Sequence, residues 1–211
     1  MSGRLVTLEG GEGAGKSTVL EAVRARLMRR GIEVVVTREP GGTALGEAVR
    51  ALVLDPSRRG VCAESELLLM FAARAQLVRE VILPAVREGR WVLSDRFTDA
   101  SYAYQGGGRG QPHVRIAALE GWAAPIEPDL TLLLDIGVAE GMARAGARGR
   151  ADRIEQEDAG FFERVRAAYR ERAAAEPARF RVIDAGRPVE AVREAACAAV
   201  DAYLDALGAS R

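Results

Sequence analysis

The sequence predicts an α/β fold, a doubly wound five-stranded parallel sheet with helices on both faces. Five short runs rich in Val, Leu or Ile lack polar alternation, as expected for strands that are covered on both faces. Helical patterns separate these runs, which is typical of βαβ units. The runs are Leu5–Leu8, Val34–Thr37, Trp91–Ser94, Leu130–Asp135 and Arg181–Ile183.

A glycine-rich stretch follows the first run directly. Residues 10–17 read GGEGAGKS and fit the pattern G-x-x-x-x-G-K-[ST]. In such a loop backbone N–H groups turn toward a phosphate, and the next helix presents its positive end. Lys16 would reach the β- and γ-phosphates of a nucleotide, and Ser17 would bind Mg²⁺. The pattern predicts a fold of the P-loop NTPase type; the alternative is a loop that only turns the chain.

Lys16 also stands out by composition. The chain holds 30 basic residues, and all except Lys16 are arginines. A slim, rotatable ammonium group fits between phosphates where a planar guanidinium does not. The single lysine therefore favours the phosphate-binding interpretation.

The totals narrow the class of protein. We expect one domain over residues 1–211, long enough to bury a core. A net charge of zero argues against a nucleic-acid partner, and no apolar run is long enough to span a membrane. Cys62 and Cys197 are isolated, which fits reduced thiols in a cytoplasmic protein. The chain has no asparagine, so the N-K-x-D guanine-reading motif of GTP switches is absent.

The sequence TREPGGT follows the second run. Arg38 and Glu39 come at the predicted strand end, Pro40 and the two glycines break the chain, and Thr43 can cap the next helix. A simple turn is one interpretation. We favour a loop that faces the ligand site, because ligands bind beyond the carboxyl ends of the strands in such sheets.

A long helix is expected next, from Ser65 to Gly89, with a possible kink at Pro84. Phe71 and Arg74 lie three residues apart and so share one face. An aromatic ring beside a guanidinium can hold a planar heterocycle by stacking and a hydrogen bond. Considered alone, Phe71 is better explained as a core residue.

The third run ends in Asp95 and Arg96. An apolar strand that ends in a carboxylate is typical of a Walker-B residue near Mg²⁺, and Arg96 beside it can clamp a second phosphate. The alternative is a surface ion pair of little energetic value. The stretch that follows carries Ser101, Tyr104 and Gln105, and then a glycine loop with an arginine.

The segment after the fourth run is rich in arginine. Four arginines and two glycines lie between positions 144 and 153. A solvated charged helix is one interpretation. We expect instead an arginine-rich lid over about 141–158, because phosphoryl transfer needs charge stabilisation and the exclusion of water.

Taken together, these motifs resemble those of bacterial thymidylate kinases, and the resemblance covers nearly the whole chain. It rests on LEGGEGAGKST, TREPGGT, LLMFAARAQ, SDRFTDASYAYQGGGRG, PDLTLLLD and ARGRADRIEQED, in that order. The resemblance implies ATP- and Mg²⁺-dependent phosphorylation of dTMP to dTDP in dTTP biosynthesis, by a homodimer. The rivals are another nucleoside monophosphate kinase, or a nucleotide-dependent switch that phosphorylates nothing.

The resemblance also implies site residues. The catalytic group would be Lys16, Asp95, Arg96 and the lid arginine Arg148, with Ser17 and Asp95 near Mg²⁺. The residues expected to contact ATP are Gly10, Gly11, Glu12, Gly13, Ala14, Gly15, Lys16, Ser17 and Thr18. The residues expected to contact dTMP are Glu12, Arg38, Phe71, Arg74, Arg96, Ser101, Tyr104 and Gln105.

Within the dTMP set, the resemblance assigns separate roles. Arg38 and Arg96 would lie at the acceptor phosphate, and Glu12 at the deoxyribose 3′-hydroxyl. Ser101 and Gln105 would lie beside the base, and Tyr104 would crowd C2′ and exclude a ribose.

Phe71 and Arg74 correspond to the thymine stacker and the donor to thymine O4. Relatives often place the stacking Phe four residues before the arginine, and Met70 holds that position here. Both Met70 and Phe71 therefore remain candidates for the stacking position.

Overall fold

The computed structural model describes residues 3–58, 60–147 and 151–209, and it contains the parallel sheet that the sequence predicts. The strand order is β2-β3-β1-β4-β5, and all neighbouring strands are parallel. Each predicted run lies in one strand, and most strands extend one or two residues further. The strands are β1 (Leu5–Gly10), β2 (Val34–Arg38), β3 (Trp91–Asp95), β4 (Leu130–Asp135) and β5 (Phe180–Asp184).

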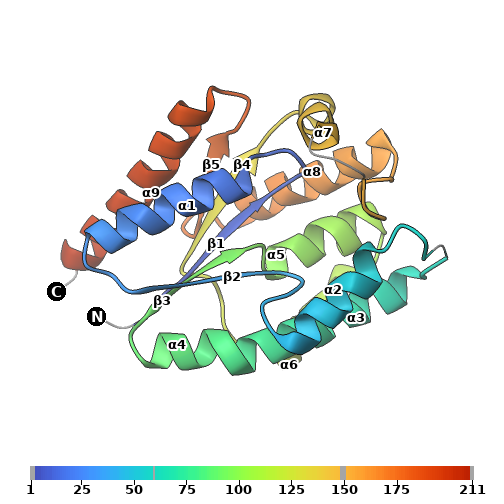
Figure 1. The fold of residues 1–211 in the computed structure, drawn as a ribbon, viewed down its shortest axis with the longest axis horizontal. Helices are drawn as coiled ribbons and strands as arrows, with labels where there is room; N and C mark the ends of the chain where they lie inside the picture. The colour runs from blue at the N-terminus through green and yellow to red at the C-terminus, as the bar shows by residue number, and fades with distance from the viewer. Residues whose placement is uncertain (1–2, 59, 148–150, 210–211) are drawn as a thin grey trace.

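One face of the sheet is covered by α1 (Lys16–Arg29) and α9 (Val189–Ala209), which run side by side in Figure 1. Val6 and Leu8 of β1 pack on this face against buried residues of both helices. Leu5, the alternate neighbour, packs on the opposite face. Because side chains alternate along a strand, burial of both sets explains the unbroken apolar run of β1. The expected burial on both faces holds for the three central strands, but it is wrong for the edge strands β2 and β5, where Val36 (43%) and Val182 (56%) are exposed.

The opposite face is covered by a larger group of helical segments (Figure 1). The segment α8 packs along η2, and α2 packs against α3. The segments outside the first face are α2 (Ala44–Leu54), α3 (Ala63–Leu77), η1 (Val78–Ile82), α4 (Leu83–Arg87), α5 (Thr98–Ser101), η2 (Tyr102–Gly108), α6 (His113–Ala123), α7 (Val138–Gly146) and α8 (Ala159–Ala175). Helices on both faces confirm the doubly wound arrangement.

The long helix predicted from Ser65 to Gly89 is continuous but not uniform. The π-helical segment η1 lies between α3 and α4 and ends just before Pro84. Proline cannot donate a backbone hydrogen bond, and its ring clashes with the carbonyl four residues earlier. Wider i→i+5 bonding just before Pro84 removes that conflict without ending the helix.

The predicted glycine loop after Gln105 is wrong, because this stretch is the π-helical segment η2. Its glycines serve close packing: a Cβ on Gly107 would lie 2.7 Å from Ala168 Cβ, and one on Gly108 would lie 2.4 Å from the Phe161 ring. Both contacts are with α8. The close approach of η2 and α8 fixes the residues of η2 that face the site.

Two further predictions concern α2 and the membrane. Thr43 caps α2 as expected, since its Oγ1 accepts a hydrogen bond of 3.0 Å from Gly46 N. Within the described ranges, no helix combines the length and apolar character needed to cross a bilayer.

Candidate active site

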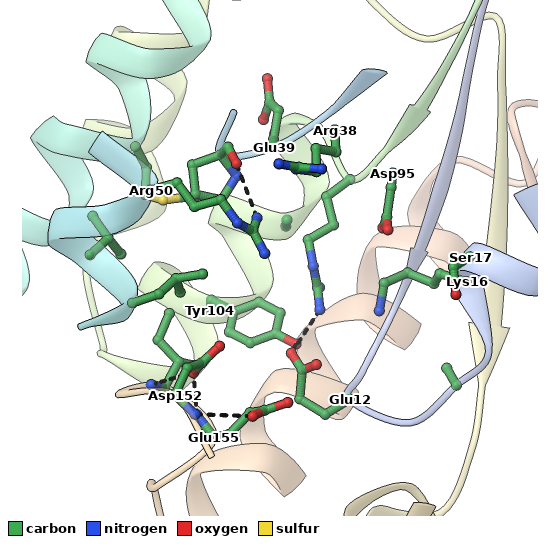
Figure 2. A pocket seen from close by; sticks show the side chains of 18 of the residues that line it. Glu12, Lys16, Ser17, Arg38, Glu39, Arg50, Asp95, Tyr104, Asp152 and Glu155 are labelled. Atoms are coloured by element: carbon green, nitrogen blue, oxygen red, sulfur yellow. Dashed lines mark hydrogen bonds and ion pairs between the residues drawn. The ribbon is translucent and has the colours of Figure 1, made fainter. Parts of the chain in front are cut away.

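A cavity of about 280 Å³ opens where β1, β2 and β3 end (Figure 2). The strand register brings these ends together, because Asp95 pairs with Leu8 on one side and with Arg38 on the other. Ligand sites of doubly wound sheets lie at this edge. The polar residues that line the cavity are Glu12, Lys16, Ser17, Arg38, Glu39, Arg50, Asp95, Arg96, Tyr104, Gln105, Asp152 and Glu155.

The loop between β1 and α1 forms one wall. Gly13 and Gly15 have φ values of 70° and 86°, a region that favours glycine. A Cβ on Gly13 would also lie 2.0 Å from the carbonyl oxygen of Gly141, so only glycine fits. The first turn of α1 has no side-chain cap, which leaves its N–H groups available to an anion.

Lys16 begins α1 and points along this loop. Its Nζ donates hydrogen bonds to the carbonyl oxygens of Gly10 (3.1 Å) and Gly11 (3.0 Å). Burial, and then the positive charge of Arg96, lower the pKa of Lys16. Both of these acceptors are neutral, so a phosphate oxygen that replaced one of them would stabilise the charged form of Lys16. Residues 12–17 all line the cavity, whereas Gly10, Gly11 and Thr18 do not.

Asp95 and Ser17 lie together beside Lys16 (Figure 2). Asp95 Oδ1 is buried and has no hydrogen-bond partner among the described residues. Those residues contain no cluster of three or more His, Cys, Asp or Glu that would hold a metal alone. This set fits Mg²⁺, which commonly uses one or two protein oxygens together with substrate phosphates and water.

Arg96 follows Asp95 and has a φ of 72°, a left-handed conformation that is rare outside glycine. The backbone around it is held on both sides: Arg96 N donates to Leu8 O, and Phe97 N donates to Oε1 of the buried Glu9 at 2.7 Å. Ser94 Oγ donates to Arg96 O. Strained residues of this kind persist where the surrounding structure imposes them, and they concentrate at functional sites.

The Arg96 side chain crosses from β3 toward the P-loop and is 14% exposed. Its guanidinium donates to Glu12 Oε1 (2.8 Å) and Gly10 O (3.0 Å). It also lies 4.7 Å from the centre of the Tyr104 ring. Tyr104 in turn donates from its hydroxyl to Glu12 Oε1 at 2.8 Å. Lys16 and Arg96 therefore place two cationic groups on one cavity, the first from the start of α1 and the second from the end of β3.

A second cationic wall is formed by Arg38 and Arg50, across the cavity from Lys16 in Figure 2. Arg38 pairs with Glu47 at 2.9 Å, and Arg50 donates to Pro40 O at 3.1 Å. Arg50 was not predicted from the sequence. The available signal is weak: it is the only arginine of α2, the helix that follows the TREPGGT loop.

The base-binding residues expected on α3 divide into two groups. Met70 lines the cavity, whereas Phe71 is buried among Leu67 and Tyr102 and does not. Arg74 also lies behind the cavity wall and is 0% exposed. The structure thus places Met70, four residues before Arg74, at the cavity.

The guanidinium of Arg74 is fixed by three partners. It is paired with Glu39 at 2.6 Å, and it donates to Ser101 Oγ (2.9 Å) and Phe97 O (3.0 Å). Ser101 is therefore buried against Arg74 and does not line the cavity. The predicted contacts of Phe71, Arg74 and Ser101 with thymine stay predictions.

The predicted lid is only partly described. Arg148, the expected lid arginine, lies outside the described residues. Arg144 on α7 is exposed and pairs with Glu140 at 2.6 Å. Arg153 does not line the cavity, because its side chain donates to Val53 O at 2.7 Å and pairs with Glu66 of α3.

Three residues within the predicted lid segment line the cavity, although the sequence analysis did not single them out. They are Asp152, Ile154 and Glu155. Asp152 Oδ1 accepts backbone hydrogen bonds from Ile154 (2.8 Å) and Glu155 (2.9 Å), which shapes this turn. Their position depends on the packing of residues 151–158 against α2 and α3, and local sequence does not encode it.

Comparison with known proteins gives a consistent result. Residues 8–196 match the family model described as thymidylate kinase. The chain is 55% identical to thymidylate kinase of Pseudomonas entomophila (strain L48) over 205 residues, which covers 97% of this chain and 96% of that protein. It is 57% identical to thymidylate kinase of Pseudomonas putida (strain F1) over 194 residues, 92% of each chain.

Among solved structures, the crystal structure of thymidylate kinase from Ehrlichia chaffeensis superposes with a TM-score of 0.72 at 31% identity. It covers 87% of this chain and 93% of the other. The family model, the relatives and the fold all agree with the cationic cavity at the ends of the strands. The chain belongs to the thymidylate kinase family, and it is a nucleoside monophosphate kinase.

Proposed function

We propose that this chain transfers the γ-phosphoryl group of ATP to the 5′-phosphate of dTMP, giving dTDP, with Mg²⁺ as the metal. The observation that supports it best is the pair of cationic groups on one cavity, Lys16 on the P-loop and Arg96 at the end of β3. Two substrates that each carry phosphate need two such positions. Family membership identifies ATP as the donor and dTMP as the acceptor.

In this proposal residues 10–18 bind the phosphates of ATP, and Lys16 neutralises charge on the β- and γ-phosphates. Ser17 and Asp95 hold Mg²⁺, which supplies charge neutralisation when it is bound. Arg96 and Arg38 bind the 5′-phosphate of dTMP and orient an oxygen of it in line with the γ-phosphorus. The protein contributes position and charge, and it forms no covalent bond to the substrates.

The remaining roles concern the nucleoside and the lid. Glu12 accepts from the 3′-hydroxyl, Tyr104 excludes a 2′-hydroxyl, and Gln105 lies at the base. Arg148 enters over the moving phosphoryl group when the lid closes. Met70 is our candidate for the side chain that packs on the thymine ring, since it lines the cavity.

An acceptor screen tests this proposal. ADP formation is followed with ATP, Mg²⁺ and each common nucleoside monophosphate in turn. We expect dTMP to give the highest specificity constant. A higher value for another monophosphate would assign the chain to a different acceptor, and ADP formation that needs no acceptor would support a nucleotide-dependent switch.

We further propose that residues 1–211 act as one kinase domain, with a lid at about 141–158, and that two copies form a cytoplasmic homodimer. Large apolar side chains are exposed on neighbouring helices α3 and α6: Leu68 (58%), Val114 (75%) and Trp122 (77%). A surface of this kind is typical of a subunit interface. Sedimentation should give twice the chain mass, and Trp122→Glu should give monomers; a wild-type monomer would contradict the proposal.

A further inference from the structure

Glu66 on α3 is a buried carboxylate at which three separate segments meet. It is 1% exposed. Its oxygens accept from Gln105 Nε2 of η2 at 2.9 Å, and they pair with Arg109 at 3.2 Å and with Arg153 at 2.6 Å. Burial raises the pKa of Glu66, but the hydrogen bonds from Gln105 and the two arginines outweigh it and leave that pKa below its ordinary value. Glu66 is therefore ionised at neutral pH.

An ionised carboxylate carries acceptor atoms only, which settles the orientation of the Gln105 amide. Gln105 can present only its NH₂ group to Glu66, whichever way an amide is assigned from coordinates. Its oxygen, Oε1, must then point away from Glu66. Gln105 lines the cavity and is 1% exposed, and Oε1 has no hydrogen-bond partner among the described residues. A buried acceptor without a partner is unfavourable, so this oxygen favours a ligand that donates.

We propose that Glu66 is a positioning residue for base selection: it holds the Gln105 amide so that an acceptor oxygen, and not an NH₂ group, faces the base of the acceptor nucleotide. This inference rests on the proposed function. Thymine and uracil carry an N3–H donor at the Watson–Crick edge, whereas cytosine carries an N3 lone pair there. The oxygen of Gln105 pairs with the first and is repelled by the second. A site built around such a hydrogen bond rejects an analogue that lacks the donor.

The test is Glu66→Gln, measured as kcat/KM for dTMP, dUMP and dCMP. An amide at position 66 offers both a donor and an acceptor, so the Gln105 amide can turn over. We expect the dTMP:dCMP ratio to fall at least about tenfold. The dTMP:dUMP ratio should stay within about twofold of wild type, because uracil keeps the N3–H and differs only by the methyl group.

Glu157→Gln is the matched control. Glu157 pairs with Arg109 at 2.6 Å, so the change loosens the same arginine and leaves the Gln105 amide bound to Glu66. The control should keep the wild-type dTMP:dCMP ratio. The proposal is overturned if Glu66→Gln keeps that ratio, if Glu157→Gln lowers it equally, or if the dTMP:dUMP ratio falls in parallel.

A second measurement uses the wild-type enzyme and does not depend on the folding of a variant. dTMP labelled with ¹⁵N at N3 is bound, and its imino proton is followed by NMR. We expect slow exchange with water and a through-space contact with the Gln105 side chain; rapid exchange overturns the proposal. Wild-type turnover of dTMP in the same samples tests the proposed function separately.

Discussion

At the scale of single residues, the two cationic side chains of the site are held in place by hydrogen bonds to other groups of the protein. Arg96 binds Glu12 and the P-loop backbone, and Lys16 binds two carbonyl oxygens of the same loop. Hydrogen bonds to charged groups contribute more than neutral ones, so these contacts hold both cations in place. Each cation then needs only a small movement to exchange a protein acceptor for a phosphate oxygen.

Lys16→Met should lower turnover by at least about 100-fold, the cost of removing one preorganised charge at the transition state. The fold should persist, because Met keeps the apolar stem of the side chain. Burial lowers the pKa of Lys16, so the buried charge opposes folding and its removal should not destabilise the protein. Turnover and Tm are measured together. Arg24→Met, an exposed change on the same helix, is the control that should leave turnover intact. Normal turnover of Lys16→Met would show that the P-loop assignment is wrong.

Tyr104→Ala should relax the rejection of a 2′-hydroxyl by about tenfold, because the ring that crowds C2′ is removed. The readout is the ratio of kcat/KM for dTMP to that for its ribonucleotide counterpart. Tyr104→Phe is the matched control: it loses the hydrogen bond to Glu12 and keeps the ring. An unchanged ratio in the alanine variant, with the protein folded, would exclude Tyr104 as the residue that selects the sugar.

Glu9 is a buried carboxyl group, and the loss of its proton lowers the stability of the folded protein. Burial, and then the charge of Asp99, raise the pKa of Glu9 to about 8. The folded state thus holds a proton that the unfolded chain releases near its ordinary pKa of 4.5. Stability from this group is complete below pH 4.5 and is lost as the pH rises through about 8.

Glu9→Gln should remove that loss, because a neutral amide can still serve both Phe97 N and the Tyr169 hydroxyl. Wild type loses about 1.4 kcal/mol for each pH unit between about 5 and 8, so the stability of the variant relative to wild type should rise by on the order of 4 kcal/mol from pH 5 to pH 8.5. Urea unfolding of both proteins at pH 5 and at pH 8.5 gives the difference in unfolding free energy between variant and wild type at each pH. The same difference at both pH values would mean that Glu9 does not titrate in this range.

At the scale of elements, packing decides structures that local sequence does not. The stretch after Gln105 holds three successive glycines and so indicates a loop, yet it forms η2 because those glycines let α8 approach closely. The π-helical segment before Pro84 has a different cause, the missing backbone donor of proline. Of the two segments only η2 reaches the cavity, where Tyr104 and Gln105 form part of the wall.

The lid segment yields the prediction at this scale. Arg148→Ala should lower kcat by about 10³-fold, the low end for an arginine that meets the phosphoryl group in the transition state. The dissociation constant of dTMP should change little, because the contact forms only at the transition state. Arg148→Lys should rescue poorly, since it lacks the planar fork.

Steady-state kinetics and a direct dTMP titration are run on both Arg148 variants. Arg144→Ala is the control, because Arg144 pairs with Glu140 and donates to Ala185 O. A loss of dTMP affinity with kcat unchanged would mean that Arg148 is a binding group and that the lid mechanism is incorrect.

At the scale of the whole molecule, the sheet was predictable because all five strands are apolar runs separated by helical patterns. Strand ends also carry the site, so Lys16, Asp95 and Arg96 could be found from their place after a run. Arg50, Asp152 and Glu155 could not, since they reach the cavity through helix packing. The choice between Met70 and Phe71 could not be predicted either. The two residues are adjacent on α3, and only the way this helix is turned against its neighbours decides that Met70 lines the cavity and Phe71 is buried in the core.

The central claim is that the cavity brings two phosphates together and moves a phosphoryl group between them. The most direct measurement follows the label from [γ-³²P]ATP in the presence of dTMP and Mg²⁺. We predict that the label appears in the β-phosphate of dTDP, with little in inorganic phosphate, and that Lys16→Met forms labelled dTDP at least about 100-fold more slowly. Label that appears in inorganic phosphate at the same rate with and without dTMP would contradict the claim.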